Sequence, residues 1–299
     1  MKFIFIFFFT FLVAQITWAQ IKVQKVATAV VKEFPINSKT NITIGANKGD
    51  VLIISTNSKF VRLTATLSSK NKDKKTAEID LLALKFDAYE KGNTLFFTNH
   101  VVLGKEGKKP TSNLHIRYLV EVPKTFKGLV KVTNEFGKIE LIQTNLKAEF
   151  ETRFSTVSIE NCQGSFRVTS DFGEVNLSNI RGAVYLNTSR SEVNVQNMEG
   201  DLRSKSKFSN LELINLDPTA VTEIIDDHSE ITIKQTCLKC THFKFNLTRS
   251  ELTLPINIQP NYSTNEAKKI DGTLFSSHLS KVISIKSESG IISLKNHSK

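Results

Sequence analysis

The sequence predicts an all-β protein, a parallel β-solenoid of about 18 residues per coil that follows a β-rich N-terminal cap. Three observations lead to this prediction: a motif recurs every 18 residues, apolar residues alternate within each copy, and Asn and Gly return at fixed positions of successive copies. The 299 residues are 40% hydrophobic, which is enough to build a core and excludes a wholly disordered chain. Only 13 Gly and 6 Pro exclude a collagen-like or Pro-rich architecture.

Residues 1–19 have the character of a secretory signal peptide. Lys2 precedes the apolar run 3–14, and Thr17 and Ala19 supply small residues at positions −3 and −1 of a cleavage site. We therefore expect cleavage after Ala19 and export to the periplasm, the outer membrane or the extracellular space. The alternative is an N-terminal membrane anchor. We expect no transmembrane segment in the mature chain.

Residues 20–127 lack the 18-residue period and predict a β-rich N-terminal region that caps the repeats. Short alternating or apolar runs predict strands, and one stretch is compatible with a short helix. The expected strands are 41–44, 51–54, 60–67, 95–97 and 116–122, with turns at Gly45 and Gly49–Asp50 and the helix at 76–84.

Residues 128–299 contain the repeats and predict a β-solenoid with irregular C-terminal coils. The hexapeptide at 136–141, Phe-Gly-Lys-Ile-Glu-Leu, is followed in unbroken register by related hexapeptides that start at 154, 172, 190 and 208. Later copies start at 228, 249 and 289, and the polar segment 259–272 between them is expected to be a loop. Since one unit cannot bury its apolar side alone, successive units should stack through parallel strands.

Several positions of the unit form columns along the predicted stack. Asn161, Asn179, Asn197 and Asn215 recur every 18 residues, and their amides are expected to form a structural hydrogen-bonded ladder. Gly164, Gly182 and Gly200 mark a corner that needs a special backbone conformation. The Phe136, Phe154, Phe172 and Phe208 column is interpreted as stacked packing and not as a ligand platform.

The sequence also resembles a known family of bacterial envelope proteins. It combines Gly49-Asp50-Val51, the strand Tyr118–Pro123, and the units Asn134–Ile139 and Ser170–Val175. These motifs are similar to those of the adhesin-like β-solenoid family, a domain of unknown function related to auto-transporter adhesin heads. The resemblance implies a right-handed β-helix-like fold in a Gram-negative cell envelope, and it carries over no catalytic residues.

Two acidic groups were considered for chemistry. Glu174 and Glu192 share a column one unit apart, and such a pair could serve a retaining glycosidase. The interpretation we favour is two solvated acids, because no apolar pocket that would tune a general acid is visible. Residues 226–230, Asp-Asp-His-Ser-Glu, could bind a metal, but adjacency alone predicts a polar turn. We therefore predict no catalytic, cofactor-binding or metal-binding residues and no cofactor.

The three cysteines have different predicted roles. Cys237 and Cys240 form a CxxC pair, for which a local disulfide after export and two free thiols are both open. Cys162 lies too many units away to reach them and is expected to be an unpaired core residue.

The formal charge of +11 suits contact with an anionic polymer or a membrane surface, but the interpretation we favour is a lysine-rich composition with solvated side chains. We predict a non-enzymatic, secreted adhesin-like protein of the cell envelope that binds a glycan or protein ligand and no nucleic acid. One alternative is a β-helix enzyme, a lyase or glycosidase acting on acidic polysaccharide. Another is a periplasmic signalling or assembly partner of another protein.

Overall fold

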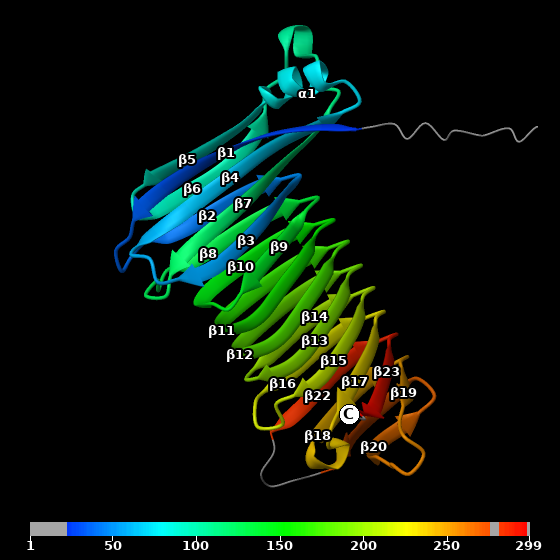
Figure 1. Cartoon of the computed structure of the whole chain (residues 1–299). Coiled ribbons are helices and arrows are strands. Elements are labelled where there is room, and N and C mark those ends of the chain that lie inside the picture. The colour runs from blue at the N-terminus through cyan, green and yellow to red at the C-terminus, as the bar shows by residue number, and fades with distance from the viewer. Residues whose placement is uncertain (1–22, 276–280, 298–299) are drawn as a thin grey trace, which may run out of the picture.

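The computed structural model describes residues 23–275 and 281–297. It is an all-β protein with a large, mostly parallel, open sheet, which is mixed because antiparallel strands occur at both ends. Figure 1 shows the strands stacked side by side along one long axis. The predicted signal peptide lies outside the described residues. None of the helices in the described ranges has the length and apolar character needed to span a bilayer.

The strands form two long rows, and most units of the chain contribute one strand to each. Row A, in spatial order, consists of β1 (Gln24–Pro35), β4 (Phe60–Asn71), β7 (Asn113–Pro123), β3 (Gly49–Thr56), β9 (Lys138–Ile142), the first part of β11 (Thr156–Asp171), the first part of β12 (Glu174–Ser189), β13 (Glu192–Glu199), β15 (Asn210–Leu216), β17 (Glu230–Gln235), β23 (Ile291–Asn296) and β19 (Glu251–Thr253).

Row B runs beside row A and contains the other strand of each unit. In spatial order it consists of β5 (Leu84–Lys91), β6 (Thr94–Val101), β2 (Asn41–Asn47), β8 (Leu129–Glu135), β10 (Asn145–Arg153), the second parts of β11 and β12, β14 (Leu202–Lys207), β16 (Thr222–Asp227), β22 (Val282–Glu288), β18 (His242–Thr248), β21 (Lys269–Leu274) and β20 (Asn261–Glu266).

The register of the parallel strands follows the 18-residue period of the sequence. Val157 pairs with Val175, and Val175 pairs with Val193, so each residue lies beside its counterpart one unit on. Side chains alternate between buried and less buried along the strands of the regular units, and the buried ones form one continuous core. One column of this core is fully buried from end to end: Ile139, Val157, Val175, Val193, Leu211, Ile231 and Ile292.

The pairing continues across the predicted boundary at residue 128. β2 pairs in parallel with β8, and β3 pairs in parallel with β9, although residues 41–56 lack the sequence period. The expected turn at Gly45 is wrong, because Gly45 lies inside β2 and the chain reverses at Lys48, whose φ is 51°. The alternating apolar residues of β2 match those of β8, and this alternation is sufficient for the register.

The order of the last units differs from the order in the sequence. The final copy of the motif, carried by β22 and β23, lies between the unit of β16 and β17 and the unit of β18 and β19. The expectation that successive units stack in sequence order is therefore wrong for the copies at 228, 249 and 289. The same interleaving occurs at the other end, where β2 and β3 lie between later segments of the chain.

The segment 259–272 is not the loop that was expected. It forms most of a hairpin, β20 and β21, and β21 pairs antiparallel with β18. Its side chains are mostly polar because β20 is an exposed edge strand. A polar segment without apolar alternation is typical of a loop, which is why the sequence did not indicate a strand here.

The N-terminal region contains the expected strands, extended at their ends, together with two strands that were not expected, β1 and β5. The predicted helix is α1 (Lys74–Leu81), which starts two residues early because Asp73 caps it. The carboxylate of Asp73 accepts hydrogen bonds from the Thr76 hydroxyl at 2.6 Å and from the Thr76 backbone N–H at 2.7 Å, and these two bonds lower the pKa of Asp73.

The interleaved C-terminal unit should be essential for stability. Ile292 is fully buried between β17 and β19, whereas its neighbour Ile291 is 44% exposed. We expect Ile292→Ala to lower the free energy of unfolding by about 2–5 kcal/mol and Ile291→Ala by less than about 0.5 kcal/mol. Urea unfolding followed by circular dichroism measures both. Equal effects would contradict the placement of β23 inside the stack.

Candidate functional site

The units turn at two corners, and both corners place a side chain with positive φ on the surface. At the first corner, Phe136, Phe154, Phe172, Arg190, Phe208 and His228 have φ between 49° and 61°; these six residues are named the phenylalanine edge. At the second corner, Gln143, Asn161, Asn179, Asn197 and Asn215 have φ between 52° and 54°; these five are named the asparagine edge. Phe in this backbone region is unusual, since only Gly, Asn and Asp adopt it readily.

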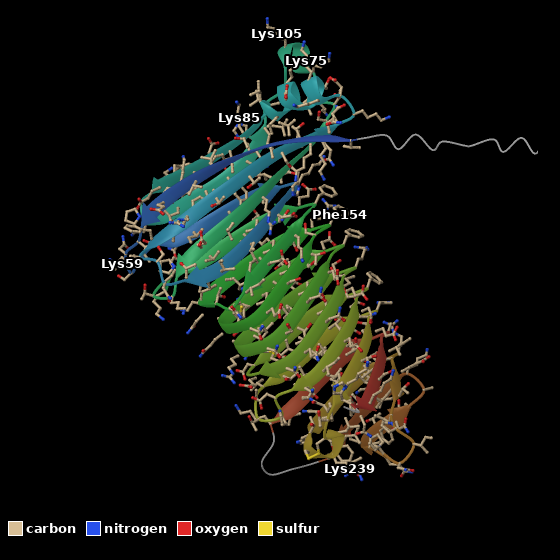
Figure 2. All side chains as sticks on the ribbon, viewed as in Figure 1. Lys59, Lys75, Lys85, Lys105, Phe154 and Lys239 are labelled. Atoms are coloured by element: carbon tan, nitrogen blue, oxygen red, sulfur yellow. A yellow bond between two sulfur atoms is a disulfide. The ribbon has the colours of Figure 1, made fainter. Side chains whose placement is uncertain are left out.

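The phenylalanine edge is a column of stacked side chains. The ring centroids of Phe136 and Phe154 are 5.1 Å apart, and those of Phe154 and Phe172 are 5.2 Å apart. Arg190 interrupts the rings, with its guanidinium 5.2 Å from the Phe172 ring and 5.4 Å from the Phe208 ring. The column lies on the surface, as the position of Phe154 in Figure 2 shows. The rings are 41–48% exposed, and those of Phe154 and Phe172 each have a neighbour on both faces.

Serine hydroxyls beneath the phenylalanine edge satisfy the backbone of the corner. The Ser191 N–H donates to the Ser209 hydroxyl at 3.3 Å, and the Ser209 N–H donates to the Ser229 hydroxyl at 3.0 Å. All three serines are buried. An unsatisfied buried N–H would cost about 1–3 kcal/mol, so each hydroxyl stabilises the turn of the preceding unit.

The asparagine edge is a chain of amide hydrogen bonds along the stack. Asn179 Nδ2 donates to Asn161 Oδ1 at 3.0 Å, Asn197 donates to Asn179 at 3.1 Å, and Asn215 donates to Asn197 at 3.1 Å. The chain ends where Asn215 Oδ1 accepts from the Thr236 hydroxyl at 2.7 Å. The structure therefore brings together all four residues of the expected ladder.

Glycine at the asparagine edge allows neighbouring units to approach closely. Gly182 has a φ of 124°, and a Cβ built there would lie 2.0 Å from the carbonyl oxygen of Gly164. No other residue fits at this spacing, because both the backbone conformation and the contact exclude a side chain.

A shallow groove follows the asparagine edge. It consists of two hollows of about 660 and 820 Å³ that share Asn179, Asn197 and Glu199. Its lining is mixed, since Met198, Leu216 and Pro218 line the second hollow beside the polar side chains. Arg181 Nε lies 2.7 Å from Glu199 Oε2 across neighbouring units. The groove offers amide donors and acceptors in a repeating row.

The acidic pair considered for glycosidase chemistry lies on the outer face of row A. Glu174 and Glu192 are register partners, and Glu174 Oε1 accepts a hydrogen bond from Asn176 Nδ2 at 2.8 Å. Glu174 is partly exposed and Glu192 is exposed. Neither lies in the apolar surroundings that a carboxylic general acid needs.

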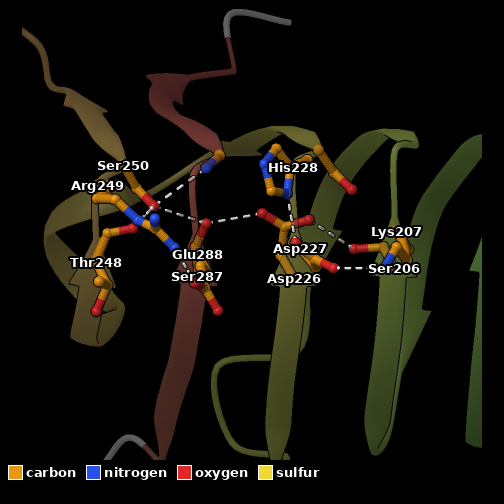
Figure 3. A network of polar contacts seen from close by, with 12 residues as sticks. Ser206, Lys207, Asp226, Asp227, His228, Thr248, Arg249, Ser250, Ser287 and Glu288 are labelled. Carbon is orange, nitrogen blue, oxygen red and sulfur yellow. Dashed lines mark hydrogen bonds and ion pairs between the residues drawn. The ribbon is translucent and has the colours of Figure 1, made fainter.

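Residues 226–230 lie in a polar network that Figure 3 shows from close by. Asp226 is 4% exposed and accepts hydrogen bonds from the Ser206 and Ser287 hydroxyls at 3.3 and 2.7 Å. Asp227 lies on the outer face, where the Lys207 ammonium 2.9 Å away and then His228 lower the pKa of its carboxyl. The two carboxylates thus point to opposite sides of β16. Among the described residues, no three His, Cys, Asp or Glu side chains gather as metal ligands.

The cysteines lie in two separate places. Cys237 and Cys240 are joined by a disulfide around a short 3-10 turn, Leu238–Cys240, beside the asparagine edge. Cys162 is a buried free thiol that donates to the Leu141 carbonyl oxygen at 3.4 Å. Burial raises the pKa of the Cys162 thiol, which keeps it protonated and unreactive.

The outer face of row B carries a column that the sequence analysis missed. Tyr185 lies between two guanidinium groups, with Arg167 5.0 Å and Arg203 5.8 Å from its ring centroid. Beyond them, Glu149 lies 3.9 Å from Arg167, and Glu223 lies 3.9 Å from Arg203. The 18-residue spacing from Arg167 to Tyr185 and Arg203 would have predicted this column, which is named the tyrosine column.

Comparisons with known proteins were made on sequence and on structure. No protein-family model and no curated protein matches the chain. Solved structures similar to it include a candidate adhesin from Bacteroides fragilis, with 13% identity, a TM-score of 0.43, and coverage of 90% of this chain and 97% of that one. A candidate cell adhesion protein from Clostridium sporogenes has 13% identity, a TM-score of 0.25, and coverage of 92% and 100%. A candidate lipid-binding protein from Parabacteroides distasonis has 10% identity, a TM-score of 0.33, and coverage of 89% and 96%. Identities and TM-scores this low assign neither a ligand nor an activity to this chain.

The amide ladder and the positive φ of Asn179 can be separated by substitution. Asn179→Gly removes the two amide hydrogen bonds but adopts the same backbone freely, so we expect a loss of about 1 kcal/mol in unfolding free energy. Asn179→Ala also introduces the strain of positive φ, and we expect a loss of about 2–3 kcal/mol. Thermal unfolding monitored by circular dichroism measures both. If Gly and Ala cost the same, the corner conformation contributes nothing.

Arg190 tests whether the phenylalanine edge is held by stacking. Arg190→Ala loses both cation–π contacts and should lower the unfolding free energy by about 1–2 kcal/mol. Arg190→Phe continues the ring column and should retain most of the stability. Urea unfolding of the two variants and of the wild type measures these changes in unfolding free energy. An equal loss in both variants would contradict a stacking role.

Proposed function

We propose that this protein is an exported, non-enzymatic, adhesin-like binding protein of the bacterial cell envelope. Its 18-residue units are coils of a right-handed parallel β-solenoid, preceded by a β-rich N-terminal region and ending in irregular coils. Its ligand is an extended glycan or protein surface that contacts many units at once.

The observation that carries this proposal is the repetition of exposed side chains along the two rows. On row B, the tyrosine column presents charged groups at successive strands, and strands in a sheet are about 4.8 Å apart. On the asparagine edge, each amide uses one donor and one acceptor within the ladder and retains further hydrogen-bonding capacity. Such a surface suits an extended ligand, which gains affinity from many weak contacts.

Support for a binding role over catalysis comes from the arrangement of the titratable groups. A catalytic site needs acid and base groups that converge on one substrate atom in an environment that separates their pKa values. Glu174 and Glu192 instead lie on the outer face among polar neighbours, and the Asp226 carboxylate is occupied by two serines.

Affinity for a polymer should therefore rise with the length of the polymer. We expect polygalacturonate fragments of graded length, used as an anionic probe, to bind more tightly as they span more units and more weakly as salt increases. Arg203→Ala/Lys205→Ala on row B should weaken binding about tenfold, or about 1.4 kcal/mol. Biolayer interferometry measures the affinities, and a reducing-sugar assay follows turnover.

The matched control is Lys59→Ala/Lys239→Ala, which removes the same charge from the connection between β3 and β4 and from the turn after β17. Figure 2 labels both residues, and neither lies on a strand that carries the tyrosine column. This variant should bind as wild type does. Affinity independent of fragment length, or release of new reducing ends, would contradict a non-enzymatic polymer-binding role. Enrichment of a single protein after cross-linking in the native envelope would instead favour a signalling or assembly partner.

A further inference from the structure

Four strands of the described residues have a hydrogen-bonded neighbour on one side only: β1, β5, β19 and β20. Such edges attract other strands unless they are blocked by charge, bulges or short length. Three of the four are protected in these ways. Lys32 Nζ donates to the Ala88 carbonyl oxygen of β5 at 3.0 Å, β19 has only three residues, and β20 carries a register shift between Tyr262 and Thr264.

β1 is protected only in part. Lys25, Lys32, Glu33 and Pro35 lie toward its ends and α1 contacts it, but its central stretch carries none of these protective residues. β1 has 12 residues and pairs with β4 in one regular register without a bulge. Its central six residues, Val26–Val31, contain no charge, Pro or Gly. Val30 is 37% and Val31 58% exposed, and most of β1 is exposed on both faces. This combination of length, regularity and exposed β-branched residues is typical of a strand that pairs with another chain.

The geometry of antiparallel pairing restricts how β1 could pair with a second copy of itself. Two residues that lie opposite each other must have their side chains on the same face of the sheet. Their backbone N–H and C=O groups must both point toward the partner strand or both point away from it. The two-fold axis must therefore pass through a residue position, so that this residue lies opposite the same residue of the second copy. Only with Ala29 at the axis does Lys25 of each copy face Glu33 of the other. A shift of the axis to Thr28 or Val30 would place these charges opposite uncharged residues.

We propose that two copies of this protein form a dimer by antiparallel pairing of their β1 strands, with Ala29 at the two-fold axis. Row A of one copy then continues into row A of the other. Arg62 Nη2 lies 2.7 Å from Glu33 Oε1 within one chain, so the partner's Lys25 completes an alternating row of three charges at each end of the interface. The pairing is isologous, closes on itself, and covers the exposed edge without leading to fibres.

A cysteine at the axis tests the register directly. In antiparallel pairs, opposite Cα atoms are about 4.5–5.5 Å apart, which a disulfide can bridge, whereas diagonal neighbours are about 7–8 Å apart. Ala29→Cys should therefore form a covalent dimer on mild oxidation, and the matched variant Thr28→Cys should form little. Native cysteines do not interfere, because Cys162 is buried and Cys237 and Cys240 are bonded to each other. Non-reducing electrophoresis measures the dimer.

The mass in solution provides an independent readout. Without its predicted signal peptide, the chain should show twice the monomer mass in light scattering. Lys25→Glu turns two attractive pairs into repulsive ones and should raise the dimer dissociation constant roughly tenfold. Lys25→Glu/Glu33→Lys should restore it. A monomer at every concentration, or equal cross-linking at positions 28 and 29, would overturn the proposal, whether or not the polymer-binding test succeeds.

Discussion

The structure depends on one backbone constraint, the two residues with positive φ that turn the chain in each regular unit. A left-handed residue other than Gly costs roughly 1–2 kcal/mol, and the chain contains a long series of them. At the asparagine edge the cost is low, because Asn tolerates this conformation and its amide bonds to the next unit. At the phenylalanine edge the stacked rings contribute about 0.5–1.5 kcal/mol per pair, which offsets a cost of similar size. Each corner is therefore stable only because the neighbouring unit is present.

This dependence on neighbours creates a problem at the two ends, where the last unit lacks a neighbour on one side. Both ends use the same solution. One early unit, β2 with β3, and the last unit in the sequence, β22 with β23, are each inserted inside the stack. Each inserted unit has a partner on both sides, so it is fixed by twice as many strand pairings as a unit at the end of the stack would have.

Much of the fold could be predicted from the sequence, because the 18-residue period fixes the neighbours of each residue between Phe136 and Leu213. The asparagine ladder and the buried Cys162 follow from the same period. The interleaving could not be predicted, since a repeat motif defines which faces pair but not which copy is adjacent. The hairpin at 259–272 was missed because an exposed edge strand carries no apolar alternation. The left-handed Phe residues were missed because local preference argues against them.

The same stacking also determines what kind of ligand the surface can bind. In the phenylalanine edge the rings of Phe154 and Phe172 each have a neighbour on both faces, so these two rings offer a sugar no free aromatic face. In the tyrosine column both faces of Tyr185 are likewise covered, by Arg167 and Arg203. The groups that remain available are amides, hydroxyls and charges at the periphery of each column. The proposed binding role would therefore rest on repeated polar contacts along the stack, with many weak contacts in place of a single deep pocket.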